Sequence, residues 1–317
     1  MQCSKCGTLA HIGDRFCEEC GASLTEDTAK NTAKGCIKCG ASLDKIDQEG
    51  YCLNCGFRNE IKEKDHLEIN LQNNLAGVSD RGLRHRKNED YLSCGKVEKN
   101  AYILVVCDGV SSSHSPELAA KAAAESGCQA LINAVENNLE LSLAMTQAIA
   151  SAQASVCDIA NGIIEDPPST TIVAAIVQNN TATIGWLGDS RAYWISSEFC
   201  QLLTIDDSWL NDMISSGTMT AEEAKKSEYA HAITRWLGAD VVDNCEPSMV
   251  NFNITSPGYL LLCTDGLWNY APSPIQIAAL IPENSESDAI TIARNLVEYA
   301  REKGGADNIT VALYKSV

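Results

Sequence analysis

Four aspartates at the ends of apolar segments constrain this chain more than any other feature. Asp108 follows YILVVC, Asp189 follows IGWLG, Asp265 follows LLLCT, and Asp307 stands just before NITVAL. Such apolar runs predict buried strands, and an unpaired carboxylate at a buried strand end is costly. One such residue could be a turn aspartate that bonds to its own backbone. Four together favour cations that hold the side chains in place.

The amino-terminal 60 residues carry eight cysteines in four CxxC pairs. They form two quartets, Cys3, Cys6, Cys17 and Cys20, then Cys36, Cys39, Cys52 and Cys55. Four thiolates suit a closed tetrahedral zinc site, and a glycine after each second cysteine favours a tight turn. Redox-active CxxC pairs are the alternative, which the ribbon-like spacing disfavours. Pairing of Cys17 and Cys20 with Cys36 and Cys39 remains open.

Composition limits the partners and the compartment. The chain has 24 basic and 42 acidic residues, a net charge of −18, which argues against sequence-independent binding to nucleic acid or anionic lipid. It has no apolar run of about 18 residues, and the amino terminus does not read as a signal peptide. CxxC cysteines fit a reducing environment. We therefore expect a cytoplasmic protein with neither nucleic acid nor membrane as a partner.

The sequence divides into two small units, a linker and a large domain. We assign zinc ribbon 1 to 1–24, zinc ribbon 2 to 35–58, a charged linker to 59–68 and the main domain to 69–317. Periodicity predicts strands at 69–79, 101–107, 170–178, 182–188, 191–196, 247–255, 258–264 and 308–315. It predicts helices at 116–137, 140–164, 206–216, 220–228, 273–281 and 287–303. Strands grouped at both ends, with long helices between, favour layered α+β packing over a parallel βαβ repeat.

Six motifs of the main domain occur in an order that resembles metal-dependent (type 2C, PPM-type) serine/threonine protein phosphatases. They are SDRGLRHRKNEDYL, VVCDGVSSS, STTIVAAIV, GWLGDSRAY, LLLCTDGLW and GGADNITVAL. The resemblance implies an α-β-β-α sandwich of two central β-sheets, with a metal site at one edge between them. The two quartets resemble the double zinc ribbon of prokaryotic regulatory proteins, which implies docking or regulation and two structural Zn²⁺ ions.

The resemblance also implies the ligands of two hydrolytic cations. Asp108 would bridge both ions, the Gly109 carbonyl would hold one, and Asp265 and Asp307 would complete the other. Asp189 would join Asp265 at a third, weaker cation. Oxygen ligands favour Mn²⁺ or Mg²⁺ over zinc. Two such ions can activate a water for in-line attack on a phosphate ester.

The remaining catalytic residues lie in SDRGLRHRKNEDYL. Glu89 would complete the metal site by orienting a coordinated water, with Asp90 supporting it from behind. The family has an arginine that clamps the phosphate three residues before the Asn-Glu-Asp step, where this chain has His85. A one-residue slip could bring Arg84 or Arg86 into that place, or His85 could act as a pH-dependent donor.

Three further segments lie beside the motifs. Ser111–Ser113 replace the paired glycines of many members and could donate to water or phosphate. Residues 208–232 are expected to form a flap that contacts substrate, with Asp206 and Asp207 capping its first helix. Asn308 is expected to fix the turn that carries Asp307.

The sequence therefore predicts a metal-dependent phosphatase acting on phosphoserine and phosphothreonine in proteins, opposing a Ser/Thr kinase. Its zinc ribbons would dock or regulate. One alternative is a non-catalytic module of the same fold that senses a partner through the ribbons and the flap. The loss of metal carboxylates would mark that module, and none is lost here. The other alternative, hydrolysis of a small phosphorylated metabolite, is excluded by no feature of the sequence.

Overall fold

The computed structural model describes residues 36, 38–47, 51–56, 65–98, 100–163, 165–240, 246–281 and 287–316. The chain divides into two compact units, Met1–Ile61 and Lys62–Val317. The first predicted quartet and residues 59–64 of the predicted linker lie outside the described residues. No described helix combines the length and apolar character needed to cross a membrane.

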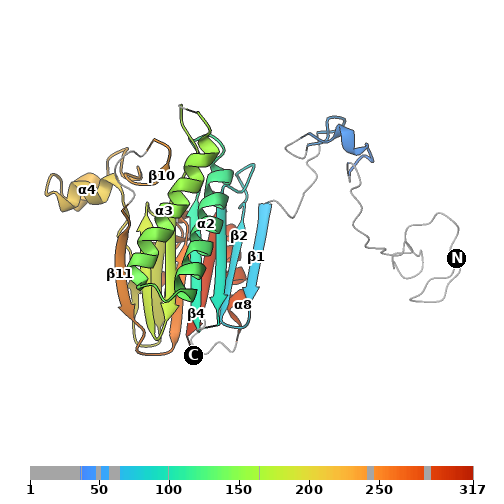
Figure 1. Ribbon diagram of the computed structural model, residues 1–317. Coiled ribbons are helices and arrows are strands. Elements are labelled where there is room, and N and C mark those ends of the chain that lie inside the picture. Colours follow the sequence, from blue (N-terminus) through green and yellow to red (C-terminus); the bar gives the residue numbers. More distant parts are fainter. Residues whose placement is uncertain are drawn as a thin grey trace, which may run out of the picture. The chain divides into compact units, whose positions relative to one another are not determined.

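Two antiparallel sheets form the centre of the second unit (Figure 1). The first sheet has, in spatial order, β1 (His66–Leu71), β2 (Leu75–Asp80), β13 (Ile309–Ser316), β12 (Gly258–Cys263), β8 (Arg191–Ser196) and β9 (Cys200–Leu202). The second has β11 (Ser248–Asn253), β7 (Thr181–Leu187), β6 (Ile172–Gln178), β4 (Ala101–Asp108) and β3 (Asp90–Val97). A short pair joins β5 (Ser169–Thr170) to β10 (Leu237–Gly238).

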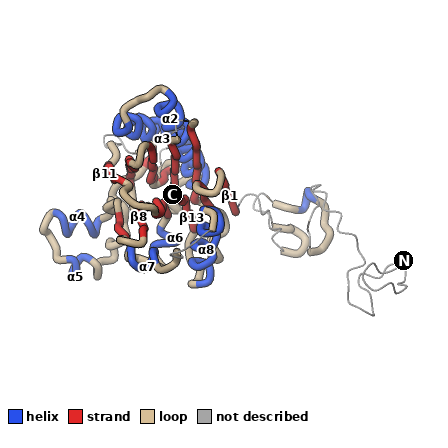
Figure 2. The backbone as a smooth tube through the Cα atoms, turned by 90° about the horizontal axis from the view of Figure 1, so that it is seen from below, coloured by secondary structure: helices blue, strands red, loops and turns tan. Residues whose placement is uncertain are grey.

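Helices cover the outer face of each sheet, and Figure 2 shows the strands between the two helical groups. The five-stranded sheet packs against α2 (Pro116–Glu136) and α3 (Leu141–Ala160), and the six-stranded sheet against α6 (Asp265–Trp268), α7 (Pro274–Ala278) and α8 (Ala289–Glu302). This arrangement confirms the predicted α-β-β-α sandwich.

Burial on both faces explains the continuous apolar strands. In β4, Ile103 and Val105 face α2 and α3, while Leu104 and Val106 belong to the core between the two sheets. Trp194 of β8 is fully buried in the same central core. A strand buried on both faces has no polar alternation, so β4 stays apolar until Asp108, where the core ends.

The structure differs from the local predictions at several places. The strand predicted at 69–79 is the hairpin of β1 and β2, which turns at Gln72 with φ of 67°. Strand β3 was not predicted at all. Of the predicted 206–216 helix, only α4 (Trp209–Ser215) forms, and it is followed by α5 (Ala221–Ala224). In Figure 2, α4 and α5 stand away from the sheets.

Candidate active site

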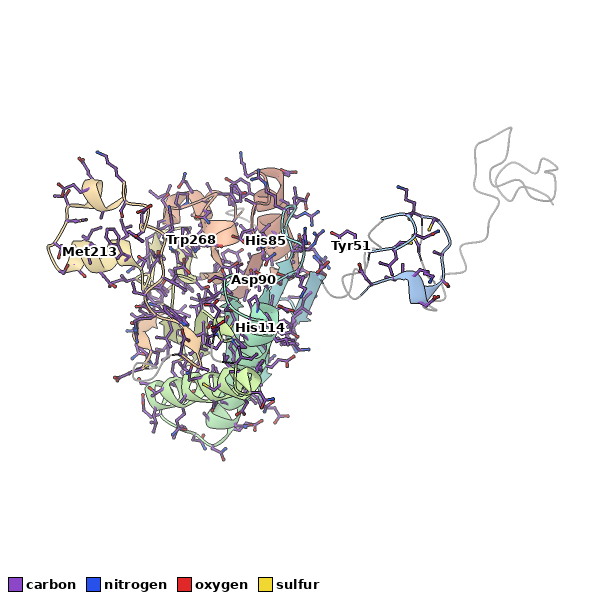
Figure 3. All side chains as sticks on the ribbon, turned by 90° about the horizontal axis from the view of Figure 1, so that it is seen from above. Tyr51, His85, Asp90, His114, Met213 and Trp268 are labelled. Atoms are coloured by element: carbon purple, nitrogen blue, oxygen red, sulfur yellow. The ribbon has the colours of Figure 1, made fainter. Side chains whose placement is uncertain are left out.

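The predicted carboxylates come from both sheets. Asp108 ends β4 and is paired in register with Asp90, the first residue of β3. Asp265 follows β12 at the start of α6, Asp307 stands two residues before β13, and Asp189 lies between β7 and β8. Antiparallel order therefore brings these residues to one end of the sandwich, where Figure 3 labels Asp90.

Mutual repulsion marks these five side chains as one electrostatic group. Burial raises the pKa of Asp108 well above its usual value, and the charges of Asp90 and Asp265 raise it further. Burial and the charge of Asp307 do the same to the pKa of Asp265. Burial also raises the pKa of Asp90 to about 7 and that of Asp189 to about 6. Ionised carboxylates of this kind need compensating positive charge.

The donor set fits hard divalent cations, with one restriction. Among the residues that the structure describes, no three of these carboxylates bring their oxygens all within 4.8 Å of one another. They are therefore not a ready cage for a single ion. If two ions share one bridging carboxylate, only the oxygens that bind the same ion have to lie close together. Oxygen donors suit Mn²⁺ and Mg²⁺.

His85 is the basic residue that reaches the carboxylates. Its Nε2 lies 3.2 Å from Oδ1 of Asp307, and the side chain is only partly exposed. Figure 3 labels it at this end of the sandwich. Arg84 and Arg86 are both exposed, and no ion pair or hydrogen bond joins either of them to the cluster within the described chain. Of the three basic residues at 84–86, His85 is therefore the one that an ion pair joins to the cluster within the described chain.

Asn308 fixes the loop that carries His85 and Glu89. Its side chain is 3% exposed, and its Oδ1 accepts from the Glu89 amide at 2.8 Å. Its Nδ2 donates to the carbonyls of Arg81 at 2.8 Å and Lys87 at 3.0 Å. Beyond the turn that carries Asp307, this side chain therefore also joins the residue before β13 to a loop more than 200 residues earlier.

Several supporting contacts were not predicted. The Thr264 hydroxyl donates to Asp90 at 2.8 Å, and the Asp108 amide donates to the Thr171 hydroxyl at 3.1 Å. Ser111 donates to Glu89 Oε2 at 2.5 Å. The role of Thr264 could have been predicted from the sequence, because this residue directly precedes Asp265. Nothing in the sequence around Thr171 indicates its contact with Asp108.

Gly109 is required by close packing. A Cβ atom at this position would lie 2.6 Å from the carbonyl oxygen of Glu89 and 2.7 Å from that of Pro116. Its amide also donates to the Glu89 carbonyl at 3.2 Å. Only glycine lets the chain after Asp108 pass this close to the Glu89 loop.

The base of the predicted flap is held by ion pairs. Arg191 donates to both oxygens of Asp206, at 2.9 and 2.7 Å, and Arg235 lies 3.3 Å from Asp207. The cap of α4 is Ser208, whose hydroxyl accepts from the amide three residues later. The prediction that the two aspartates cap this helix was therefore wrong, because arginine partners already engage both carboxylates.

The second cysteine quartet forms a compact sulfur cluster. The ligand atoms of Cys36, Cys39, Cys52 and Cys55 all lie within 4.8 Å of one another, and two Sγ–Sγ distances are 3.6 and 3.5 Å. A tetrahedron with zinc–sulfur bonds of about 2.3 Å has edges of about 3.8 Å, so the sulfurs fit one zinc ion. Within-quartet pairing accounts for this geometry without Cys17 or Cys20.

Backbone amides support these thiolates. Desolvation raises the pKa of Cys36, but hydrogen bonds from the amides of Cys39 and Lys38 outweigh it and lower the pKa to about 6. Gly40 and Gly56 have φ of 73° and 67°, the left-handed conformation that favours glycine. The predicted knuckle turns are present in this quartet. The first quartet lies outside the described residues.

A family model described as "Protein phosphatase 2C" matches residues 81–298, which include Asp90, Asp108, Asp189 and Asp265. The chain belongs to the protein phosphatase 2C family. A second family model, "Double zinc ribbon", matches residues 3–56. The phosphatase 2C match covers the strands and loops that supply four of the five aspartates, and Asp307 lies nine residues beyond its end.

Bacterial proteins are similar along this phosphatase 2C domain. The serine/threonine phosphatase stp of Listeria welshimeri is 29% identical over 245 residues, which are 74% of this chain and 92% of that protein. The serine/threonine protein phosphatase PstP of Mycobacterium tuberculosis is 28% identical over 254 residues, 77% of this chain and 45% of PstP.

Solved structures share the phosphatase 2C fold. The crystal structure of Stp1 from Staphylococcus aureus matches with a TM-score of 0.66 and 25% identity, covering 80% of this chain and 98% of that one. The catalytic domain of PstP in complex with two manganese ions matches with a TM-score of 0.57 and 26% identity, covering 77% and 98%.

Proposed function

We propose that this chain is a metal-dependent protein phosphatase that hydrolyses phosphoserine and phosphothreonine. The observation that carries the proposal is the convergence of five carboxylates, from both sheets, at one end of a phosphatase 2C domain. Burial, and after it the charges of neighbouring aspartates, raises the pKa values of Asp108 and Asp265, so the site needs cations to hold it in its ionised form.

The ligands follow from the chain positions. Asp108, the Gly109 carbonyl, Asp265 and Asp307 would hold two Mn²⁺ or Mg²⁺ ions, and Asp189 would join Asp265 at a third. The PstP catalytic domain, which was solved in complex with two manganese ions, supports a pair of such ions in this fold. When bound, such ions make water nucleophilic at neutral pH and screen the charge of the phosphate.

The protein groups around these ligands position the reactants. Glu89 is held through its amide by Asn308 and through its carboxylate by Ser111, so it is placed to orient a water that the cations would hold. Asp90 stays behind the site, where Thr264 donates to it. His85 is placed to donate from its ring to a phosphate oxygen next to Asp307.

The partners follow from the activity and from the ribbons. A phosphatase of this class would reverse the action of a Ser/Thr kinase on the same substrates. The zinc-binding cysteine quartets would dock the enzyme or regulate it. A cytoplasmic location agrees with the free thiols of Cys107, Cys128 and Cys263 in the core, since such thiols persist in a reducing compartment.

One comparison tests the activity. The full chain is assayed with Mn²⁺ on p-nitrophenyl phosphate and on a phosphothreonine peptide, beside Asp108→Asn and Asp158→Asn. Asp158 is an exposed aspartate of α3 and serves as the matched control. We expect Asp108→Asn to abolish turnover of both substrates and Asp158→Asn to retain it. Metal-independent turnover, or an active Asp108→Asn, would contradict the mechanism.

A further inference from the structure

Two arginines beside the active site lack the carboxylate partner that the other described arginines have. The described part of the chain contains seven arginines, and five form ion pairs. These pairs are Arg81–Asp65, Arg191–Asp206, Arg235–Asp207, Arg294–Glu68 and Arg301–Asp80. Arg84 and Arg86 are exposed and have no ion pair with any described residue. In a chain with a net charge of −18, two free arginines in one loop require an explanation.

The backbone that carries these arginines is rigid. Asn308 holds the carbonyls of Arg81 and Lys87, at either end of the loop. The Leu83 amide donates to the Gly305 carbonyl at 2.8 Å, and Arg81 Nη1 donates to the His85 carbonyl at 2.5 Å. Arg84 and Arg86 are therefore presented from a fixed frame, which lowers the entropy lost when they bind a ligand.

Close packing fixes the frame further. Gly82 has φ of 71°, and a Cβ there would lie 2.1 Å from the Asp307 carbonyl oxygen. The loop is thus seated directly against the turn that carries Asp307. The backbone that carries Arg84 and Arg86 cannot move away from this turn without breaking the contact.

The spacing places both arginines within reach of the residues that flank a bound phosphoresidue. They stand on either side of His85, whose ring contacts Asp307, and consecutive Cα atoms are about 3.8 Å apart. An extended peptide advances about 3.3 Å per residue. Side chains two or three positions from the phosphorylated residue would therefore lie roughly 7–10 Å from it. Arg84 and Arg86 flank His85, which contacts Asp307, so their side chains extend from the loop that borders the cluster.

We propose that Arg84 and Arg86 select phosphoproteins with acidic residues within about three positions of the phosphorylated side chain. The inference rests on the proposed phosphatase activity and specifies its substrate class. Arginine binds carboxylate by paired, charge-assisted hydrogen bonds. The overall negative charge of the enzyme opposes an acidic peptide, but salt screens that repulsion beyond about 8 Å, so the nearby arginines dominate.

The test compares two phosphothreonine peptides of equal length, one with Asp and Glu at the flanking positions and one with Asn and Gln. The full-length enzyme with Mn²⁺ should prefer the acidic peptide by about threefold to tenfold in kcat/KM, the range expected for two exposed ion pairs. In the double variant Arg84→Gln/Arg86→Gln this ratio should fall to about one. The wild-type preference should also shrink as salt is raised.

A charge-matched control is available at the opposite end of the sheets. Lys96 lies near the end of β3, whose first residue is Asp90, and Lys315 lies near the end of β13, which begins just after Asp307. The double variant Lys96→Gln/Lys315→Gln removes the same charge from the chain. It should retain the preference for the acidic peptide, because the recognition is local.

Each other outcome has a distinct meaning. If Arg84→Gln/Arg86→Gln slows both peptides and p-nitrophenyl phosphate by one factor, the arginines contact the phosphate itself and the inference is wrong. Equal wild-type rates on the two peptides would also overturn it, while leaving the phosphatase activity standing. If neither peptide is hydrolysed, the proposed function fails and the inference fails with it.

Discussion

Replacing Asn308 by alanine should destabilise the phosphatase domain far more than one polar substitution usually does. The change removes three hydrogen bonds from a side chain that is 3% exposed, those to the Glu89 amide and to the Arg81 and Lys87 carbonyls. At a net value of about 1 kcal/mol each, the expected loss in free energy of unfolding is about 2–4 kcal/mol.

Tryptophan fluorescence during urea unfolding measures this loss in the intact protein. All five tryptophans, Trp186, Trp194, Trp209, Trp236 and Trp268, lie in the phosphatase domain, so the signal is free of the zinc ribbons. The matched control is Asn253→Ala, because Asn253 is exposed and makes a single contact of 3.5 Å. That control should stay within about 0.5 kcal/mol of wild type. A similarly small loss for Asn308→Ala would refute the role we assign to this side chain.

Three further predictions concern the site and the ribbon. In metal-free protein, burial holds the pKa of Asp90 at about 7 and that of Asp189 at about 6. A carboxyl group whose pKa is higher in the folded protein than the unfolded value of about 3.9 makes the folded protein less stable as the pH rises from that unfolded pKa through the folded pKa. Bound Mn²⁺ would offset this loss. The increase in melting temperature on adding Mn²⁺ should therefore be larger at about pH 7.5 than at about pH 5. A constant increase would contradict this prediction. His85→Arg should preserve or raise turnover of p-nitrophenyl phosphate, because arginine binds phosphate bidentately, and a strong loss would show that the imidazole itself is needed. Cys52→Ser should remove one zinc ion per chain, measured by elemental analysis, without slowing p-nitrophenyl phosphate hydrolysis, and an unchanged zinc content would exclude the second quartet as a site.

Features encoded by short segments could be predicted from the sequence. The apolar run before Asp108 predicts a buried strand because β4 is covered on both faces. The apolar run before Asp265 likewise predicts β12, which is also buried on both faces. The CxxC spacing of the second quartet predicts its sulfur cluster because both cysteines of each pair lie on one tight turn. In these cases the neighbours in the chain are also the neighbours in the fold.

Features that depend on distant contacts could not be predicted. Strand β3 begins at Asp90, a residue that disfavours strands, and it is set by pairing with β4. The polar turn at Gln72 splits one apparent strand into β1 and β2 without a glycine to mark it. Asp206 looked like a helix cap because its partner, Arg191, lies 15 residues away.

The central claim is that the carboxylates of both sheets converge to bind two hydrolytic cations. An anomalous difference map from a crystal grown with Mn²⁺ tests it most directly. We predict two strong peaks among Asp108, Asp265 and Asp307, and their loss in Asp108→Asn. A map without manganese at these side chains would contradict the account.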